Sequence, residues 1–295
     1  MRLDPTSLRL FVCVAEEGSI AAAAERAHLA AAAVSKRISE LEQGLGTALL
    51  RRSNKGVEPT TAGIELVHLA RGVLHDLDDI VTRMRDFGGG LRGQVRVFAN
   101  VSAITQFLPA QLKSFLADYP RVDVRLDERV STAIVRAVAE NAADIGIFTA
   151  CAVGAELETF PYRCDELVVA VPDGHPLAAR QSVSIREALD FDLVSMHAGS
   201  QIHLQLVRAA SEAGLVFKPR IHVPGYDALC LMVQAGMGLG ILPRSSAAPY
   251  QDTLGIRTVR LDEPWAARQL VIGVRAYDSL SAVARLLVDR LLDAA

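Results

Sequence analysis

The sequence has few cysteines and no recognisable spacing among them. The four, Cys13, Cys151, Cys164 and Cys230, form no CxxC pair or other metal-binding pattern. Isolated thiols of this kind are typical of a reduced cytosolic protein rather than a disulfide-bonded secreted one. A redox switch between Cys151 and Cys164 is the alternative that remains open.

Long apolar runs are also missing. No stretch approaches the roughly 20 consecutive apolar residues that a membrane helix requires. Residues 1–5, Met-Arg-Leu-Asp-Pro, lead into an amphipathic pattern and not into the apolar region of a signal peptide. We therefore expect a cytoplasmic protein that has no membrane partner.

The sequence contains none of the common catalytic or cofactor motifs. Its seven histidines make no HExxH set, and no GxSxG elbow surrounds Ser195 or Ser200. The glycines at 236, 238 and 240 follow a predicted helix and enter a predicted strand, the reverse of a dinucleotide-binding turn. We expect no metal, no cofactor and no enzymatic activity. His197 and His203 are candidates for holding an acidic ligand.

An excess of one charge is absent overall but present locally. The 295 residues, enough for about two domains, include 31 Lys and Arg against 34 Asp and Glu, a net charge of −3. The whole molecule is therefore not a nucleic-acid-binding polycation. Between Lys36 and Lys55, however, five positive side chains are accompanied by only two carboxylates. This basic stretch would be doubled in a dimer, and it predicts DNA binding that weakens with salt.

The first 60 residues carry three helix patterns followed by a hairpin pattern. Asp4 and Pro5 can begin a helix that Gly18 ends, and Ser19 can cap a second, Ala-rich helix. The third helix has one buried apolar face, formed by Val34, Ile38, Leu41 and Leu45. Two short strands around a Ser-Asn-Lys-Gly turn follow, so residues 18–60 predict a winged helix-turn-helix.

Several short motifs in this stretch occur in an order that is typical of one family. They are Gly18-Ser19, residues 23–26 (Ala-Ala-Glu-Arg), residues 33–38 (Ala-Val-Ser-Lys-Arg-Ile), Leu41-Glu42, Leu45-Gly46 and residues 60–63 (Thr-Thr-Ala-Gly). With them, residues 1–90 closely resemble the N-terminal domain of LysR-type transcriptional regulators. The resemblance implies a DNA-binding head joined to an effector-binding domain, and it continues more loosely to the C-terminus.

Two positions depart from the family pattern. The family commonly has Ser as the N-cap of the recognition helix and Gln after it, whereas this chain has Ala30 and Ala31. An Ala N-cap costs roughly 1 kcal/mol, and the missing Gln removes a bidentate reader of adenine. Base readout from that position should therefore be mostly apolar. We expect DNA contacts from Ala31, Ala32, Ser35, Lys36, Arg37, Arg51, Arg52 and Lys55. An Ala-rich hairpin that serves only packing is the alternative.

A long helix is predicted from Thr60 or Thr61 to near Phe87. Its apolar residues recur at alternating spacings of four and three, the pattern of a coiled-coil seam. We expect it to form a homodimer through Leu66, Ala70, Val73, Leu77, Ile80, Met84 and Phe87. Packing of this helix on its own domain is the alternative. The predicted domains are residues 1–60 (winged head), 61–90 (dimerisation helix and hinge) and 91–295 (effector binding).

Beyond residue 91, predicted strands and helices alternate, which indicates a mostly parallel α/β sheet. Among them are a single helix over Ser102–Tyr119 and a strand over Glu166–Val171. Residues 174–178 (Gly-His-Pro-Leu-Ala) and 233–243 resemble the effector domain of the same family, which is similar to periplasmic solute-binding proteins. The resemblance implies two subdomains beside a cleft, residues 93–162 with 267–295 and residues 163–266.

We expect ligands at the strand ends that precede helices, because α/β sheets bind ligands there. Hydroxyl residues at a helix N-terminus favour an anion such as a carboxylate. We expect the effector to be bound by Asn100, Ser102, Thr149, Ser200, Gln201 and Tyr226. The alternative is that each hydroxyl only caps its own helix.

Together these patterns predict a homodimeric or homotetrameric transcriptional regulator. Its partners would be an inverted-repeat DNA site and a small, anionic effector, with RNA polymerase as a further candidate. One alternative is a cytoplasmic solute-binding module whose DNA-binding head lacks sequence specificity, which Ala30 and Ala31 keep open. Another is an α/β enzyme.

Overall fold

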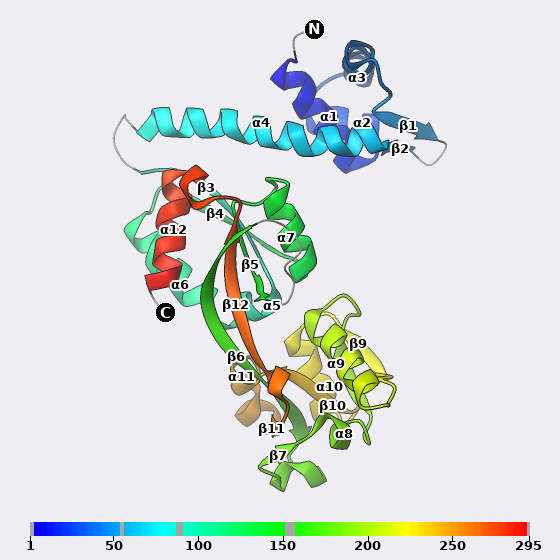
Figure 1. The fold of residues 1–295 in the computed structure, drawn as a ribbon, viewed down its shortest axis with the longest axis vertical. Helices are drawn as coiled ribbons and strands as arrows, with labels where there is room; N and C mark the ends of the chain where they lie inside the picture. Colours follow the sequence, from blue (N-terminus) through cyan, green and yellow to red (C-terminus); the bar gives the residue numbers. More distant parts are fainter. Residues whose placement is uncertain (1–2, 54–55, 87–90, 151–156, 294–295) are drawn as a thin grey trace. The chain divides into compact units, whose positions relative to one another are not determined.

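A computed structural model of the chain describes residues 3–53, 56–86, 91–150 and 157–293. The chain forms two compact units, Met1–Gly90 with Glu140–Ala142 and Leu91–Ala139 with Ala143–Ala295. We call them the N-terminal unit and the C-terminal unit (Figure 1). Within the described residues, no helix combines the length and the apolarity needed to cross a membrane.

The N-terminal unit is a helix-turn-helix followed by a two-stranded wing and a long helix. Its elements are α1 (Pro5–Glu17), α2 (Ile20–Arg26), α3 (Ala31–Leu45), β1 (Leu50–Ser53), β2 (Gly56–Pro59) and α4 (Thr61–Asp86). The predicted helix ends are confirmed. Asp4 accepts hydrogen bonds from the backbone nitrogens of Thr6 and Ser7, Gly18 ends α1 in the left-handed conformation, and Ser19 caps α2.

The core of this unit is aliphatic apart from one phenylalanine. Phe11, Val34 and Ile38 are fully buried and Leu41 nearly so, which confirms the predicted face of α3. Leu45 differs from the prediction, because it lies in the last turn of α3 and is 39% exposed. The first turn of α3 lacks a side-chain cap, as expected from the sequence. Ala30 provides no side-chain hydrogen bond at the N-cap position.

Glu42 connects α3 to the wing. Its Oε1 accepts hydrogen bonds from the backbone nitrogens of Leu49 (2.8 Å) and Leu50 (3.0 Å), both of which are buried. The Leu-Glu pair of the family motif thus has a physical basis. Leu41 fills the core, while Glu42 satisfies the two donors at the start of β1.

We predict that Glu42→Ala lowers the free energy of unfolding of the N-terminal unit by about 2 kcal/mol, because two buried N–H groups lose their acceptor. Urea denaturation would measure the change. Glu40→Ala is the matched control. Glu40 is on the same helix and forms an exposed pair with Lys36, so its loss should cost less than about 0.5 kcal/mol. Equal effects of the two substitutions would contradict this role of Glu42.

The start of α4 packs closely on the loop before the wing. Thr60 Oγ1 donates to the carbonyl of Ala48 (2.8 Å) and accepts from the backbone nitrogen of Gly63 (3.0 Å). A Cβ at Gly63 would lie 2.0 Å from the carbonyl oxygen of Leu49. Residues 60–63 therefore need a capping threonine and, three positions later, a residue without a side chain.

The C-terminal unit is a two-lobed α/β structure. Its elements in order are β3 (Gly93–Ala99), α5 (Val101–Gln106), α6 (Leu108–Asp118), β4 (Val122–Glu128), α7 (Ser131–Ala139), β5 (Ile145–Thr149), β6 (Glu158–Pro172), η2 (Pro176–Ala179), β7 (Ser182–Val183), α8 (Ile185–Ala188), β8 (Leu193–Met196), α9 (Gln201–Glu212), β9 (Ile221–Val223), α10 (Tyr226–Gln234), β10 (Leu239–Pro243), α11 (Arg244–Leu254), β11 (Ile256–Leu261), η3 (Pro264–Ala266), β12 (Ala267–Val274), η4 (Tyr277–Ser279) and α12 (Ala282–Asp293).

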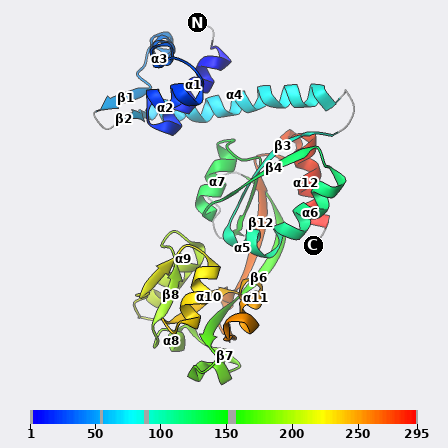
Figure 2. The same ribbon diagram turned by 180° about the vertical axis from the view of Figure 1, so that it is seen from behind.

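Two long neighbouring strands, β6 and β12, connect the lobes (Figure 2). The sheet order is β4-β3-β5-β12-β6-β10-β8-β9, with β11 pairing with β6 and β7. Up to Glu166, β6 pairs with β12, and from Leu167 on it pairs with β10 and β11. Each lobe has its own hydrophobic core. The first lobe is built around Val97, Ile147 and Leu287, and the second lobe around Val169 and Leu242.

The structure corrects three expectations for this unit. The sheet is mixed, because β6 runs antiparallel to β12, β10 and β11, whereas the parallel pairs lie toward the sheet edges. The helix expected over Ser102–Tyr119 is broken at Phe107, where Pro109 cannot donate the next helical hydrogen bond. The strand expected over Glu166–Val171 is the second half of β6, and α11 and β11 were not expected.

Candidate functional site

The exposed face of α3 has mostly small side chains, and few of them can form hydrogen bonds to base edges. Ala31 and Ala32 are exposed in its first turn, and Lys36 and Arg37 are exposed one turn later, while Ser35 is half-buried. A face of methyl groups can lie close to base edges and contact thymine methyls. Among the described side chains of α3, the small ones near its N-terminus allow close contact with DNA, and the charged ones lie toward its middle.

The described basic side chains of this surface all have carboxylate partners. Arg37 contacts Asp4 at 2.7 Å, Lys36 contacts Glu40 at 3.8 Å, and Arg51 contacts Glu58 across the wing at 3.0 Å. These pairs are exposed, and such pairs contribute about 0–1 kcal/mol. DNA phosphates could therefore replace the carboxylates at little cost. Arg52 lies on β1, but its side chain is not among the described ones, and Lys55 lies outside the described residues.

The predicted seam on α4 divides between two roles. Ala70 is buried against Leu8 and Val12 of α1, and Leu66 also packs there, so these two positions serve the fold of the unit itself. Val73 and Ile80 are about half exposed and Leu77 is half-buried. The side chain of Met84 is not among the described ones, and Phe87 lies outside the described residues.

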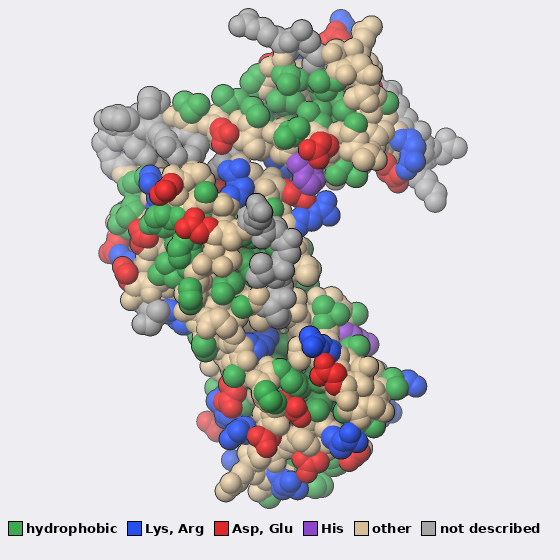
Figure 3. Space-filling model, in the orientation of Figure 1, with side chains coloured by type: hydrophobic (Ala, Val, Ile, Leu, Met, Phe, Trp, Pro, Cys, Tyr) green, Lys and Arg blue, Asp and Glu red, His purple; other side chains and the backbone are tan. Residues whose placement is uncertain are grey.

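The free apolar face of α4 is rotated relative to the predicted seam. Leu69 is 59% exposed, Val73 49%, Ile80 56% and Val81 47%. Figure 3 shows apolar side chains gathered over the N-terminal unit. Because Ala70 is 1% exposed, it is not available to a second subunit, whereas Leu69 and Val81 are.

A cavity of about 320 Å³ lies in the C-terminal unit. Both lobes line it, and all six residues predicted to bind the effector are part of its wall: Asn100, Ser102, Thr149, Ser200, Gln201 and Tyr226. His197, a candidate for holding an acidic ligand, lines it as well, and the remaining lining residues were not predicted to bind the effector: Val101, Glu128, Arg129, Val130, Ser131, Ala133, Ile202 and Arg268.

Two of the six residues also cap their own helices. Asn100 Oδ1 accepts from the backbone nitrogen of Ala103 (3.0 Å) at the start of α5, and its Nδ2 donates to Thr149 Oγ1 (3.2 Å). Ser200 Oγ accepts from the backbone nitrogen of His203 (3.1 Å) at the start of α9. Asn100 and Ser200 therefore cap their own helices and also line the cavity.

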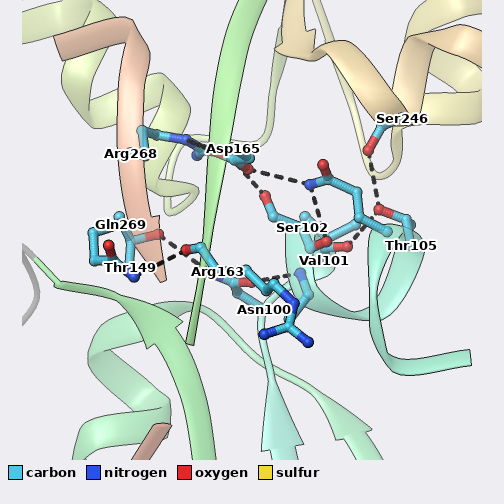
Figure 4. A network of polar contacts seen from close by, with 12 residues as sticks. Asn100, Val101, Ser102, Thr105, Thr149, Arg163, Asp165, Ser246, Arg268 and Gln269 are labelled. Atoms are coloured by element: carbon cyan, nitrogen blue, oxygen red, sulfur yellow. Dashed lines mark hydrogen bonds and ion pairs between the residues drawn. The ribbon is translucent and has the colours of Figure 1, made fainter. Parts of the chain in front are cut away.

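Ser102 belongs to a buried polar network that joins the lobes (Figure 4). Its hydroxyl lies 3.0 Å from the hydroxyl of Tyr226 and accepts a hydrogen bond from Arg268 Nη2 at 3.0 Å. Arg268 in turn forms an ion pair with Asp165 on β6. Burial raises the pKa of Tyr226, so its hydroxyl stays protonated at neutral pH.

Of the two candidate histidines, only His197 lines the cavity. His203 Nδ1 lies 3.0 Å from Ser195 Oγ, and burial together with the neighbouring His222 and His197 lowers its pKa. Among the described residues, no group of three or more His, Cys, Asp or Glu side chains is placed to hold a metal ion. Cys164 contacts Gln269, and Cys151, its partner in the redox alternative, lies outside the described residues.

Two family profiles match the sequence. The profile described as "Bacterial regulatory helix-turn-helix protein, lysR family" covers residues 5–64, and "LysR substrate binding domain" covers residues 88–295. The chain belongs to the LysR family. It is a DNA-binding transcriptional regulator with a substrate-binding effector domain, and the predicted family and fold class are confirmed.

Known LysR-type proteins resemble this regulator over most of its length. LrrA of Synechococcus elongatus, described as a probable regulator, is 30% identical over 249 residues, 84% of this chain and 83% of that one. The RuBisCO operon transcriptional regulator of Allochromatium vinosum is 28% identical over 242 residues, 82% of this chain and 80% of that one. Like others with significant similarity that are described by function, these relatives are transcriptional regulators.

Solved structures share the fold of this LysR-type chain. A full-length OxyR variant from Pseudomonas aeruginosa has a TM-score of 0.74 at 22% identity and covers 99% of this chain and 94% of its own. Full-length CbnR in complex with its target DNA has a TM-score of 0.70 at 22% identity and covers 99% of this chain and all of its own. At this identity the likeness establishes the fold alone.

Arg268, which lines the cavity of this LysR-type regulator, and its ion-pair partner Asp165 were not predicted from the sequence. Arg268 and Asp165 meet across β12 and β6, although they are 103 positions apart in the chain. Neither belongs to a local motif, and their pairing depends on the register of two long strands. The only available signal was a charged residue immediately before each of two predicted strands, Glu166–Val171 and Gln269–Val274, and charged residues are common at such positions.

Proposed function

We propose that this LysR-type regulator binds an inverted-repeat operator as a homodimer and that a small anionic metabolite in the cavity controls it. The observation that carries the proposal is the convergence on one cavity of six residues chosen from separate strand ends. In this proposal residues 1–60 bind DNA, residues 61–90 pair the subunits and residues 91–295 bind the effector. The protein acts in the cytoplasm, with assembly to a tetramer and contact with RNA polymerase as further steps.

The cavity favours an anion for two reasons. The first turns of α7 and α9 line it, and helix N-termini carry partial positive charge. Arg129 and Arg268 line it as well, against the single carboxylate of Glu128. Its volume of about 320 Å³ is near the lower end of ligand pockets, so the effector should be a small metabolite.

The DNA-binding part of the proposal depends on the α3 face and the wing. A face of alanines supplies close contact but little hydrogen-bond readout, so pairing of two heads must add to the specificity. Gel-shift titration of the full-length protein on the DNA upstream of its own gene, with competitor DNA present, tests this. Retention of that site under competition supports the proposal. Indifference to sequence would favour the solute-binding module with a non-specific head.

We predict that Arg51→Ala reduces the slope of log affinity against log salt by about one unit per head, because a phosphate contact is lost. It should also weaken binding, since Glu58 is left without its partner beside the DNA. Fluorescence anisotropy over a series of KCl concentrations measures both effects.

Arg257→Ala is the control for this substitution. It removes the same charge from β11, where Arg257 pairs with Asp173 in the C-terminal unit. The salt slope should not change. If the two variants alter the slope equally, the effect comes from net charge and Arg51 has no phosphate contact.

A further inference from the structure

Arg268 is a cavity-lining cation that sits deep in the C-terminal unit. It is the second residue of β12, and its side chain is 9% exposed, while the paired Asp165 side chain is 2% exposed. A buried guanidinium is costly unless it is paired. A buried charged side chain that has an ion-pair partner and also lines a cavity is therefore a candidate for ligand binding.

The ion pair fixes the orientation of this guanidinium. Arg268 Nε donates to Asp165 Oδ1 at 2.7 Å, and Nη2 contacts the other carboxylate oxygen. Nη2 also donates to Ser102 Oγ at 3.0 Å. Of the five N–H donors of an arginine, these contacts use the three on Nε and Nη2. A side-chain hydrogen bond to the Tyr226 hydroxyl takes a fourth donor, so one N–H of the guanidinium remains for a ligand.

Asp165 does not require the remaining donor. Its Oδ2 also accepts from Gln106 Nε2 at 3.2 Å, so protein groups satisfy both oxygens (Figure 4). Burial alone would lower the pKa of Arg268, but the Asp165 carboxylate raises it. The guanidinium is therefore charged and held by one edge, and its other edge adjoins the cavity-lining hydroxyls of Ser102 and Tyr226.

We propose that Arg268 anchors a carboxylate of the effector through its remaining N–H, with the Ser102 and Tyr226 hydroxyls beside it. The inference rests on the proposed function, in which this cavity is the effector site. Val101, Val130 and Ile202 form an apolar part of the wall. A cavity of roughly 150 Å³ holds benzene, so about 320 Å³ accommodates a carboxylate joined to a ring or short chain. The effector class is a small monocarboxylate with a compact apolar body.

The test compares phenylacetate with its uncharged counterpart phenylacetamide in thermal-shift titrations of the full-length protein. Wild type should require about tenfold less phenylacetate than phenylacetamide for a half-maximal shift. The double variant Asp165→Leu with Arg268→Met removes the pair without leaving a buried charge. Its affinity for phenylacetate should fall about 10- to 100-fold, the loss expected for a hydrogen bond to a charged group, while that for phenylacetamide stays within about threefold.

Two further variants make the result unambiguous. Glu166→Leu with Arg244→Met removes the exposed pair at the next position of β6, away from the cavity lining, and should retain the preference for phenylacetate. Arg268→Lys retains the charge but not the planar fork. If the double variant does not fold, this substitution alone should still lose about tenfold in phenylacetate affinity with phenylacetamide unchanged.

The outcomes separate this inference from the proposed function. A phenylacetate preference that survives both Arg268 substitutions overturns the anchoring role of Arg268. Shifts by organic phosphates or sugars, with none by phenylacetate or hexanoate, overturn the carboxylate class and leave the cavity as the effector site. If no compound of any class shifts wild type, the proposed function fails, and this inference fails with it.

Discussion

Replacing Gly63 by alanine should destabilise the N-terminal unit by about 3 kcal/mol or more and abolish DNA binding. The added Cβ would lie 2.0 Å from the carbonyl oxygen of Leu49 and 3.0 Å from its carbonyl carbon. Both are backbone atoms in the loop that Glu42 and Thr60 hold, so no side chain can move aside. Urea denaturation followed by circular dichroism, together with a gel shift, measures the two effects.

Gly72→Ala is the matched control, because it is the same substitution on the same helix. Nothing lies within 4 Å of a Cβ at Gly72, so alanine there should stabilise α4 by up to about 1 kcal/mol through its higher helix propensity. The two substitutions are thus expected to act in opposite directions. If Gly63→Ala does not destabilise the protein, the start of α4 does not pack closely on the loop before the wing.

The double variant Val73→Asp with Ile80→Asp should dissociate the proposed dimer and weaken operator binding by about 100-fold or more. Both residues are among the exposed apolar side chains of α4, and two carboxylates in a helix–helix seam are buried only at high cost. A monomer also loses the gain in affinity that two linked heads provide, which is typically 10²- to 10⁴-fold. Sedimentation equilibrium and anisotropy titration measure the two losses.

Ile64→Asp is the control for the α4 seam. Ile64 is also exposed on α4, at 47%, but it lies outside the predicted heptad positions and on another side of the helix. The variant should remain dimeric. An intact oligomer in the Val73 and Ile80 variant would show that pairing uses a different surface.

The sequence predicted the N-terminal unit well because its signals are local. Asp4, Gly18 and Ser19 act on backbone groups within three or four positions, and the spacing of Val34, Ile38 and Leu41 defines one face of one helix. The predicted dimerisation seam depends on more than local signals. Periodicity shows that Leu66 and Ala70 share a face, but it does not show whether α1 or a second subunit covers that face.

The C-terminal unit was less predictable because its sheet is formed by strands that are far apart in the sequence. The first half of β6 reads Glu-Thr-Phe-Pro-Tyr-Arg-Cys, without a strong strand pattern, and becomes a strand by pairing with β12. The six predicted cavity residues followed from a local rule, that ligands lie at strand ends before helices. Arg268 and Asp165 followed from no local rule, since only the register of β6 against β12 brings them together.

The most direct test is the affinity of the full-length protein for its operator, measured with and without the carboxylate that gives the largest thermal shift. A saturating carboxylate should change operator affinity about 5- to 150-fold, the usual range of allosteric coupling. Ala133→Phe, which fills the cavity from α7, should abolish that change while leaving DNA binding intact. A carboxylate that stabilises the protein but leaves operator affinity unchanged would contradict control of DNA binding through this cavity.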